Sequence, residues 1–351
     1  MDSQKVIEFL KAYEQPVKIM EVCGTHTQSI VKHGIRDLIS PSIRLVSGPG
    51  CPVCVTVPVY IDRLIDFAFE KNCRVLSFGD LFKVKGSKYS LSEAKSAGAK
   101  IEMIYSPFEA LDMAGKNKAI QHLVAAIGFE TTIPVYAVLL EEIIARGIEN
   151  IRFSTSLKAV LPAIAYICEN EHIDGFICPG HVSVITGAKA YRQLAQKYNK
   201  PFVIAGFEPE HILASVYGIL HQIPFAVRQV ENHYKSVVKE EGNLKALNLI
   251  DRYFTANKDA VWRGIGKIEN SAYVLKEEYE AYDFSGSDSE PDGSYSNMPP
   301  GCRCGDVLLG RILPDECELF GSRCVPNNAV GACMVSAEGA CGIWYGKLGY
   351  M

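Results

Sequence analysis

Cysteine residues are the side chains of this sequence best suited to chemistry, and they are clustered. The chain has 351 residues, of which 12 are cysteines. Two early motifs, "EVCGTHT" and "GPGCPVC", contain Cys23, Cys51 and Cys54. The end of the chain contains Cys302, Cys304, Cys317, Cys324, Cys333 and Cys341. In a reducing compartment, such clusters favour metal binding or thiol chemistry over structural disulfides.

The first motif places Cys23 three residues before His26, between an expected strand and an expected helix. A thiolate and an imidazole at this spacing could bind a metal such as Fe(II). They could also form a nucleophile with a nearby base. In either case the amino terminus of the helix is expected to lower the pKa of the thiol. A cysteine in a tight glycine turn, followed by a capping threonine, is the structural alternative, and the motif alone does not decide.

The second motif places Cys51 and Cys54 in a C-x-x-C arrangement at the start of a helix, as in redox-active dithiols. A structural zinc site usually needs two such pairs, or one pair with nearby histidines. The sequence has no second C-x-x-C. The flanking prolines and glycines make the loop rigid and allow tight turns. The motif therefore favours a thiol–disulfide pair.

The C-terminal cysteines lie in a glycine-rich segment with too little apolar mass to order itself. Four thiolates suit a [4Fe-4S] cluster or a tetrahedral zinc ion, and two remain for a further dithiol. Spacing alone does not select the four. The other cysteines, Cys73, Cys168 and Cys178, lie in apolar runs, and we expect them to be small buried hydrophobic residues.

Short apolar segments alternate with amphipathic ones from residue 17 to about residue 222. The segments expected to be strands are 17–22, 43–48, 74–80, 100–107, 122–127, 151–156, 173–178 and 202–205. This alternation predicts the α/β class, with parallel sheets and right-handed crossovers. We expect two doubly wound parallel-sheet domains, 1–117 and 118–233. A small, irregular, mainly helical cysteine-rich domain, 234–351, would follow, with a helix at 234–254 and a polar loop at 284–301.

Polar motifs follow the expected strands at their carboxyl ends, where parallel sheets form their sites. Besides Cys23 and His26, these motifs supply Asp80, Glu130, Thr131, His181 and Glu208. Each could be a helix cap or part of a turn. Together they predict a shared cleft between two domains.

Charge and hydropathy exclude several classes of function. The formal net charge is -4, which gives no indication of binding to nucleic acid or to an anionic membrane surface. No apolar run reaches the length of a transmembrane helix, and the amino terminus lacks the apolar core of a signal peptide. We therefore expect a cytoplasmic protein.

The motifs CGTHT, GPGCPVC, GFETT and PGHVS, in this order before a cysteine-rich end, resemble the HypD family of hydrogenase maturation factors. The resemblance covers nearly the whole chain. The cluster pattern of that family, C-x14-C-x6-C-x16-C, is matched by Cys302, Cys317, Cys324 and Cys341. Cys304 and Cys333 match a thiol pair beside the cluster. One departure is Lys83 in "GDLFKVKG", where the family often has an arginine; lysine keeps the charge but lacks the bidentate fork.

The resemblance implies a scaffold on which the Fe(CN)2(CO) group of [NiFe] hydrogenases is built. Cys23 would bind a transient Fe(II) that receives CN and CO, and a [4Fe-4S] cluster would be the resident cofactor. The implied partners are a small HypC-type chaperone with a second thiolate, a HypE-type cyanide donor, and the hydrogenase large subunit.

The resemblance also implies roles for the remaining motif residues. His26 would be an iron ligand or a proton donor oriented by Asp80. Cys51 and Cys54 would pass electrons or protons beside the iron, supplied through the cluster and the Cys304/Cys333 pair. The residues expected to line the cleft or bind partners are Glu130, Thr131, His181 and Glu208.

Two other functions stay open. An iron–sulfur thiol–disulfide reductase without iron cargo would need Cys51 and Cys54 but not Cys23. A zinc-containing binding module would have no redox role. Whether the protein is an enzyme is left open, because a scaffold can also carry electron-transfer activity. The preferred interpretation depends on Cys23, Cys51 and Cys54 lying close together.

Overall fold

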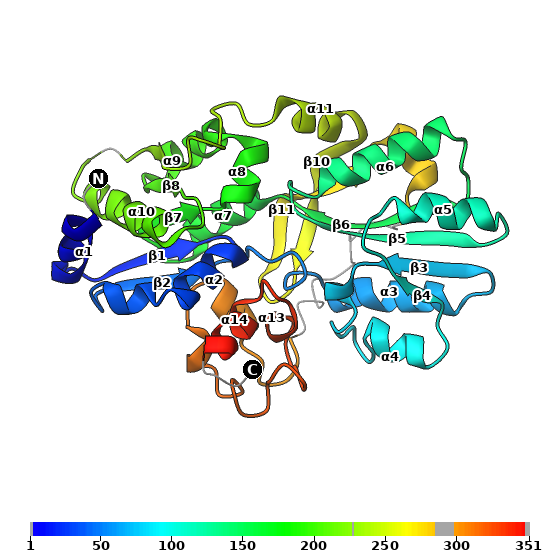
Figure 1. Ribbon diagram of the computed structural model, residues 1–351, viewed down its shortest axis with the longest axis horizontal. Coiled ribbons are helices and arrows are strands. Elements are labelled where there is room, and N and C mark those ends of the chain that lie inside the picture. The colour runs from blue at the N-terminus through cyan, green and yellow to red at the C-terminus, as the bar shows by residue number, and fades with distance from the viewer. Residues whose placement is uncertain (1–2, 227, 285–297, 348–351) are drawn as a thin grey trace. The chain divides into compact units, whose positions relative to one another are not determined.

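The computed structural model describes residues 3–226, 228–284 and 298–347 (Figure 1). They form two compact units. Unit 1 comprises the described residues of Met1–Cys51, Val160–Leu244 and Met298–Met351, and unit 2 those of Pro52–Ala159 and Lys245–Asn297. None of the helices in these residues is both long enough and apolar enough to span a membrane.

Unit 1 is built on a five-stranded sheet in the order β2-β1-β7-β8-β9. Its strands are β1 (Val17–Glu21), β2 (Ile43–Ser47), β7 (Gly175–Cys178), β8 (Phe202–Ile204) and β9 (Val230–Asn232). All neighbouring pairs are parallel. Strands β7 and β8 are completely buried and β1 and β2 nearly so, because both faces of a parallel sheet are covered by helices, whereas the edge strand β9 is half-buried.

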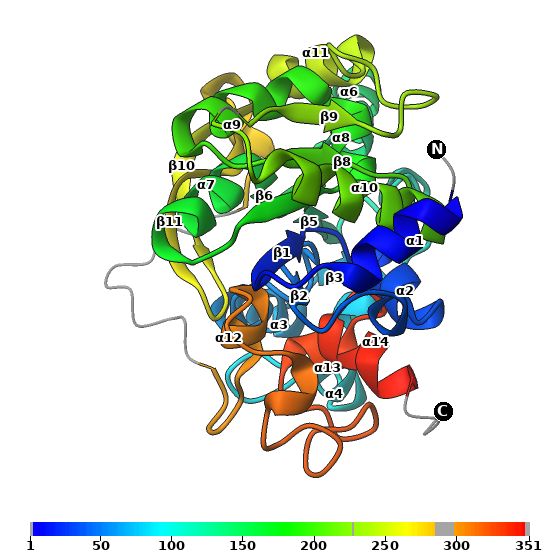
Figure 2. The same ribbon diagram turned by 90° about the vertical axis from the view of Figure 1, so that its left-hand side faces the viewer.

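The helices of unit 1 cover both faces of this sheet (Figure 2). On one face, α1 (Ser3–Ala12), α2 (Gly24–Lys32) and α10 (Pro209–Gln222) share an apolar core with β1, β2, β7 and β8. On the other face, Tyr191 packs near Phe202 of β8. The remaining helices before the C-terminal segment are η1 (Ile35–Leu38), α7 (Val160–Asn170), α8 (Gly180–Thr186), η3 (Ala188–Tyr191) and α9 (Arg192–Tyr198).

The cysteine-rich segment belongs to unit 1. It forms four short helices: α12 (Cys304–Leu308), η6 (Pro314–Glu316), α13 (Ala332–Val335) and α14 (Ala340–Lys347). Helix α14 packs against α2, and α12 packs against β2. The Arg36 guanidinium lies 4.3 Å from the centroid of the Trp344 ring, which ties α14 to the loop before β2. The sheet of unit 1 thus supplies the support that the segment cannot supply itself.

Unit 2 is built on a six-stranded sheet in the order β10-β11-β6-β5-β3-β4. Strands β3 (Cys73–Ser77), β4 (Ile101–Met103), β5 (Gln121–Gly128) and β6 (Ile151–Lys158) are parallel to one another. The hairpin of β10 (Phe254–Trp262) and β11 (Gly266–Leu275) extends the sheet in antiparallel fashion. The helices of unit 2 are α3 (Pro58–Phe69), η2 (Gly79–Leu81), α4 (Leu91–Ser96), α5 (Glu109–Lys116), α6 (Ile133–Ala145) and η4 (Glu277–Tyr282), and α11 (Leu244–Tyr253) begins at the unit boundary.

The α/β class and the parallel sheets are confirmed, but the units differ from the expected segments 1–117, 118–233 and 234–351. The chain leaves unit 1 after β2, builds the parallel strands of unit 2, and returns because β7 pairs with β1. In the segment expected to be helical at 234–254, only Leu244–Tyr253 is helical. The β10/β11 hairpin was not predicted, and most of the predicted loop at 284–301 lies outside the described residues.

Each sheet has one point at which the strand order reverses direction. In unit 1 this point lies between β1 and β7, and in unit 2 it lies between β3 and β5. Ligands of open α/β sheets usually bind beyond the carboxyl ends of the strands at such a point. In unit 1, Cys23 and His181 directly follow the strands there; in unit 2, Asp80 and Glu130 do so.

Candidate functional site

Cys23 lies directly after β1, at the amino-terminal end of α2. Its backbone is extended, and its N–H donates to Oε2 of Glu21 at 2.9 Å. The hydroxyl of Thr27 donates to the other oxygen of the same carboxyl group. A buried glutamate therefore fixes both ends of the first turn after the strand. Cys23 as a whole is buried, with 8% of its surface exposed.

The Cys23 thiol does not have the low pKa that its helix position suggested. Burial, and then the charge of Glu21, raise its pKa to about 12, although the backbone N–H groups of Thr25 and His26 act in the opposite direction. The thiol is thus protonated at neutral pH and is a poor free nucleophile. A bound cation would reverse this, because a metal ion stabilises the thiolate that coordinates it. This chemistry favours a metal ligand over an activated nucleophile.

His26 is completely buried, and its Nε2 lies 3.1 Å from the carbonyl oxygen of Gly206. Its Nδ1 has no hydrogen-bond partner among the residues that the structure describes. Burial lowers the pKa of His26 to about 4, so the ring is neutral at pH 7. The ring of Phe207 lies between two imidazoles, with centroids 5.0 Å from His26 and 4.3 Å from His181. In unit 1 the group that orients His26 is the Gly206 carbonyl; a role of Asp80, which belongs to unit 2, stays a prediction.

Cys51 and Cys54 form a disulfide. The boundary between the units falls immediately after Cys51, so this cysteine can be compared with Cys23 inside unit 1. The backbone of Gly50 lies directly on that of Cys23: a Cβ atom on Gly50 would be 2.5 Å from the Cys23 nitrogen and 2.6 Å from its Cα. Only glycine permits this approach. The two cysteine motifs of unit 1 are therefore in contact.

The cysteine-rich segment also contacts the Cys23 and Cys51 loops. The Ser336 hydroxyl lies 3.3 Å from the Cys51 sulfur, and both side chains are buried. A Cβ atom on Gly24 would be 2.5 Å from the carbonyl oxygen of Glu338. The residues that follow Cys333 in the chain thus touch both cysteine loops.

Five of the six C-terminal cysteines line one small cavity. Its volume is about 10 Å³, and its lining includes Cys302, Cys304, Cys317, Cys324 and Cys341. The sulfurs of Cys302 and Cys304 are 3.3 Å apart. Cys333 does not line the cavity, but its hydrogen bonds with Cys304 and Cys341 raise its pKa. Hydrogen bonds with Cys304 and then with Cys333 lower the pKa of Cys341 to about 6. The cavity is thus a centre rich in thiols, one of which favours the thiolate form.

The donor chemistry of this cavity fits an iron–sulfur cluster, which is held by cysteine thiolates. The four cysteines matched by the family pattern all line it, and the remaining two, Cys304 and Cys333, are in contact with each other. Within the described ranges, no group of three or more histidine, cysteine or acidic side chains has the geometry of a metal site. The cavity itself has room for about one water molecule, so the sulfurs would have to move apart around a cluster.

The other predicted site residues are divided between the units. In unit 1, His181 and Glu208 are exposed. In unit 2, Asp80 and Lys83 are exposed, Thr131 is half-buried and Glu130 is buried. The charge of Glu130 adds to burial in raising the pKa of Tyr273, which places these two groups near each other. Among the cysteines expected only to pack, Cys73 and Cys178 are buried and Cys168 is partly exposed.

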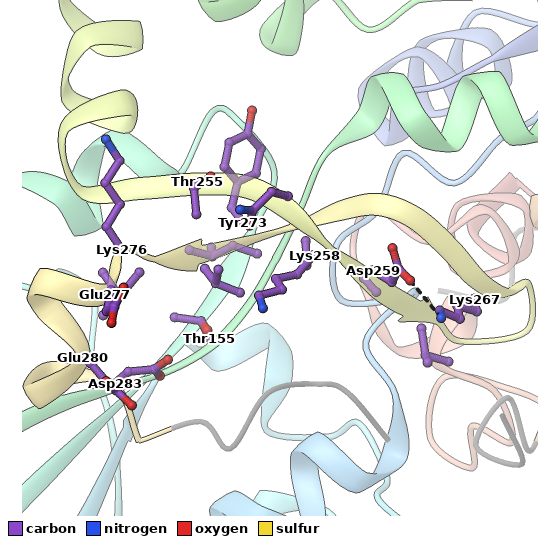
Figure 3. A pocket seen from close by; sticks show the side chains of 17 residues that line it. Thr155, Thr255, Lys258, Asp259, Lys267, Tyr273, Lys276, Glu277, Glu280 and Asp283 are labelled. Carbon is purple, nitrogen blue, oxygen red and sulfur yellow. Dashed lines mark ion pairs between the residues drawn. The ribbon is translucent and has the colours of Figure 1, made fainter. Parts of the chain in front are cut away.

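Unit 2 has a larger cavity of about 730 Å³ beside the β10/β11 hairpin (Figure 3). Charged side chains line it, and Lys267 forms an ion pair with Asp259 at 2.8 Å. None of the site residues predicted from the sequence contributes to its lining. The described lining of this cavity thus contains no cysteine.

Three residues with contacts at the thiols were not predicted: Glu21, Ser336 and Glu338. The position of Glu21 within "EVCGTHT" could have drawn attention to it, because a carboxylate at the end of a buried strand needs partners. Ser336 and Glu338 lie in "VSAEG", which has no spacing typical of a chemical motif. Their contacts with Cys51 and Gly24 depend on the folding of distant segments.

These features define an α/β protein with a buried thiol and an imidazole at the switch point of a parallel sheet, beside a cysteine-rich segment. The HypD family model, described as "Hydrogenase formation hypA family", matches residues 2–347. The chain therefore belongs to the HypD family.

Curated relatives match over most of their length. The chain is 39% identical over 334 residues to the hydrogenase maturation factor HypD of Escherichia coli, covering 95% of this chain and 89% of the relative. It is 40% identical over 330 residues to a putative hydrogenase expression/formation protein of Methanocaldococcus jannaschii, covering 94% and 91%. The hydrogenase maturation factor HypD of Rhodobacter capsulatus is 39% identical over 337 residues, with 95% and 89% covered.

Proposed function

We propose that this protein acts in hydrogenase maturation, as a scaffold that holds iron while CN and CO are added. Membership of the HypD family supports the maturation role. The observation that carries the scaffold role is the meeting of three thiol-bearing segments in unit 1. The Cys23 loop touches the Cys51 loop through Gly50, and the Cys51 sulfur touches Ser336 of the cysteine-rich segment.

Cys23 is the proposed thiolate ligand of the iron substrate. The raised pKa of its thiol makes the thiolate dependent on a cation, which suits a site that is filled only transiently. His26 is the proposed neighbour of the iron, as a ligand or as a proton donor. Its ring is neutral and its Nε2 donates to the Gly206 carbonyl, so the unprotonated Nδ1 suits a ligand, whereas a proton donor would first have to take up a proton on Nδ1. A second thiolate would come from a HypC-type chaperone, cyanide from a HypE-type donor, and the finished group would pass to the hydrogenase large subunit.

The proposed resident cofactor is a [4Fe-4S] cluster held by Cys302, Cys317, Cys324 and Cys341. When bound, such a cluster supplies one-electron chemistry. Cys304 and Cys333 form the thiol pair beside it, and their mutual hydrogen bond supports exchange between dithiol and disulfide. Cys51 and Cys54, which form a disulfide, are the proposed second redox pair.

Infrared spectroscopy of anaerobically purified protein with its small partner tests the scaffold role. We expect bands from iron-bound CN and CO in the wild type. Cys23→Ala should remove these bands and leave the absorption of the cluster unchanged. Cys178→Ala is the matched control, because it removes a buried thiol of the same unit from the end of β7. Bands that persist in Cys23→Ala would contradict the proposal.

The Cys51–Cys54 disulfide also supports a second candidate function, that of a thiol–disulfide reductase without iron cargo. That alternative predicts turnover of disulfide substrates without a partner protein. The turnover would depend on Cys51 and Cys54 and would be unchanged in Cys23→Ala. Partner-free turnover together with absent CN and CO bands would therefore favour the reductase.

A further inference from the structure

One aromatic ring in unit 1 contacts the side chains of three other segments. Phe207 lies three residues after β8, and its ring centroid is 5.0 Å from that of His26 and 4.3 Å from that of His181. The ring of Tyr234 meets it nearly edge-on, at 6.1 Å and 77°. His26, His181 and Tyr234 follow β1, β7 and β9, respectively. Phe207 thus joins the ends of four neighbouring strands of one parallel sheet.

The ring of His26 has too few hydrogen bonds to fix its plane. Within the described part of the chain, Nε2 bonds to the Gly206 carbonyl oxygen at 3.1 Å, and the buried Nδ1 has no partner. The carbonyl oxygen of Ala205 is also near this ring. Since a carbonyl oxygen only accepts, Nε2 carries the proton and Nδ1 of the neutral ring carries a lone pair. One such bond leaves the ring free to turn, because χ2 of histidine is broad and roughly two-fold.

Phe207 supplies the missing contact. Its ring is inclined by 38° to the imidazole of His26, at a centroid distance typical of favourable aromatic pairs. The carbonyl that accepts from Nε2 belongs to Gly206, the residue directly before Phe207. Two consecutive residues after β8 therefore act on the same imidazole, one by a hydrogen bond and the other by its flat face.

We propose that Phe207 is a positioning residue of the iron site, which fixes the ring plane of His26 so that Nδ1 is the nitrogen presented to the iron. This inference rests on the proposed function, because it takes the iron as the ligand of Nδ1. It makes His26 an iron ligand rather than a proton donor. Histidines that bind metals usually donate their other ring N–H to a carbonyl or carboxylate, as His26 does to Gly206.

Phe207 is itself held by the segment that follows β7. A Cβ atom on Gly180 would lie 2.9 Å from Cζ of Phe207 and 2.7 Å from the carbonyl oxygen of Ala205. The backbone of Gly180 therefore packs directly on the ring, which only glycine permits. With Tyr234 as a further contact, the position of the Phe207 ring is determined by two neighbouring segments.

Nuclear magnetic resonance of the protein labelled with 15N-histidine tests the proposal without iron. At pH 8, above the ordinary histidine pKa of about 6.5, long-range 1H–15N spectra show which ring nitrogen of each of the eight histidines carries the proton. His26→Gln identifies the signals of His26. We expect a single Nε2–H form in the wild type. Phe207→Leu should raise the population of other forms roughly two- to twelvefold, the factor to which the free energy of one aromatic contact corresponds.

Two outcomes of this experiment would overturn the proposal. The first is a wild-type His26 with its proton on Nδ1 or shared between both nitrogens. The second is a Phe207→Leu variant whose His26 signals equal those of the wild type. Phe207→Met also removes the flat ring, fills the space with a flexible side chain and carries the same expectation, so it replaces Phe207→Leu if that variant does not fold.

Tyr217→Leu is the matched control. It takes an aromatic ring from beside His221, at a centroid distance of 5.8 Å in the same unit, and should leave the His26 signals unchanged. If Tyr217→Leu changes them as much as Phe207→Leu does, the effect is a general loss of packing and the inference is wrong.

The infrared experiment separates this inference from the scaffold role. Phe207→Leu should broaden or shift the CN and CO bands, because the orientation of a ligand then varies, whereas Cys23→Ala should remove them. Bands in Phe207→Leu identical to those of the wild type would overturn the role of Phe207 and leave the scaffold standing. Absence of the bands from the wild type would instead contradict the scaffold, whatever form the His26 ring takes.

Discussion

The two parallel sheets have the same kind of switch point but present different chemistry there. In unit 1 the segments that directly follow β1 and β7 carry Cys23, His26 and His181, the two histidines in the first turns of α2 and α8. In unit 2 the segments that directly follow β3 and β5 carry Asp80, in η2, and Glu130. The cysteine-rich segment also belongs to unit 1. The fold therefore provides a place for a site, and the loop residues decide what the site can bind.

The cavities of the two units show the same contrast. The thiol cavity of unit 1 measures about 10 Å³, whereas the cavity beside the β10/β11 hairpin measures about 730 Å³ and is lined by charged groups. Volume alone would point to unit 2. The chemistry of the lining points to unit 1, because five cysteines line one small space and cysteine thiolates are the ligands of iron–sulfur clusters.

The largest expected effect comes from removing a thiol at the cavity of unit 1. Cys341→Ala should abolish most of the bound iron and acid-labile sulfide of anaerobically purified protein, because a cluster needs its four thiolates. Cys73→Ala is the control in unit 2, where the thiol is buried near Glu70 with a sulfur–oxygen distance of 3.8 Å. It should keep the wild-type iron and sulfide content. Equal content in both variants would remove the distinction between the units.

A smaller effect, on the free energy of unfolding, is expected when alanine replaces Gly50, which follows β2, or Gly79, which follows β3. A Cβ atom on Gly50 would clash with the Cys23 backbone at 2.5 Å, which cannot move without displacing the proposed iron ligand. A Cβ atom on Gly79 would meet only the flexible Met103 side chain, at 3.4 Å. Gly50→Ala should therefore lower the free energy of unfolding by about 1–3 kcal/mol. Gly79→Ala should change it by less than about 0.5 kcal/mol.

Chemical denaturation of the two glycine variants measures this difference. Alkylation of Cys23 in the folded protein supplies a second measurement, since displacement of its loop should expose the thiol in Gly50→Ala only. If both variants are equally stable and equally protected, the contact between the two cysteine loops does not constrain the site.

The sequence predicts local structure well because strand and helix patterns are local. The eight strands expected between residues 17 and 222 all occur, most within a few residues of the expected bounds. Their grouping is not local. Strand β7 pairs with β1, for example at Ile19 and Gly175, and the residue pattern of either strand alone does not predict this pairing. Because this pairing cannot be seen in the sequence, the similar alternation of strands and helices in the two halves of the chain suggested two consecutive domains.

The site residues likewise fall into those that local sequence patterns reveal and those that only contacts between distant segments reveal. The cysteines and histidines could be found because their types and spacing are unusual. Ser336 could not, because its contact with Cys51 joins residues 285 positions apart. The pKa of Cys23 was predicted in the wrong direction, since the helix position is visible in the sequence but the burial that outweighs it is not.

The smallest expected effect compares two buried histidines, His26 in unit 1 and His122 in unit 2. Burial lowers the pKa of each to about 4 from an ordinary value of 6.5. The unfolded chain therefore takes up a proton below pH 6.5 that the folded protein does not, so each histidine makes stability fall as the pH drops from 6.5 toward 4. For each histidine, the free energy of unfolding falls by at most about 1.4 kcal/mol per pH unit.

Substitution by leucine separates the two histidines. Neither ring nitrogen of His122 has a hydrogen bond of good geometry within the described part of the chain, whereas His26 bonds to the Gly206 carbonyl. His122→Leu should thus leave stability at pH 7 unchanged and flatten its decline by at most about 2 kcal/mol at pH 5. His26→Leu should flatten the decline similarly but cost about 1–3 kcal/mol at pH 7, because a buried carbonyl loses its donor. Denaturant unfolding at pH 5 and pH 7 measures both differences. A His122→Leu variant that keeps the wild-type pH dependence would show that His122 is protonated in the folded protein.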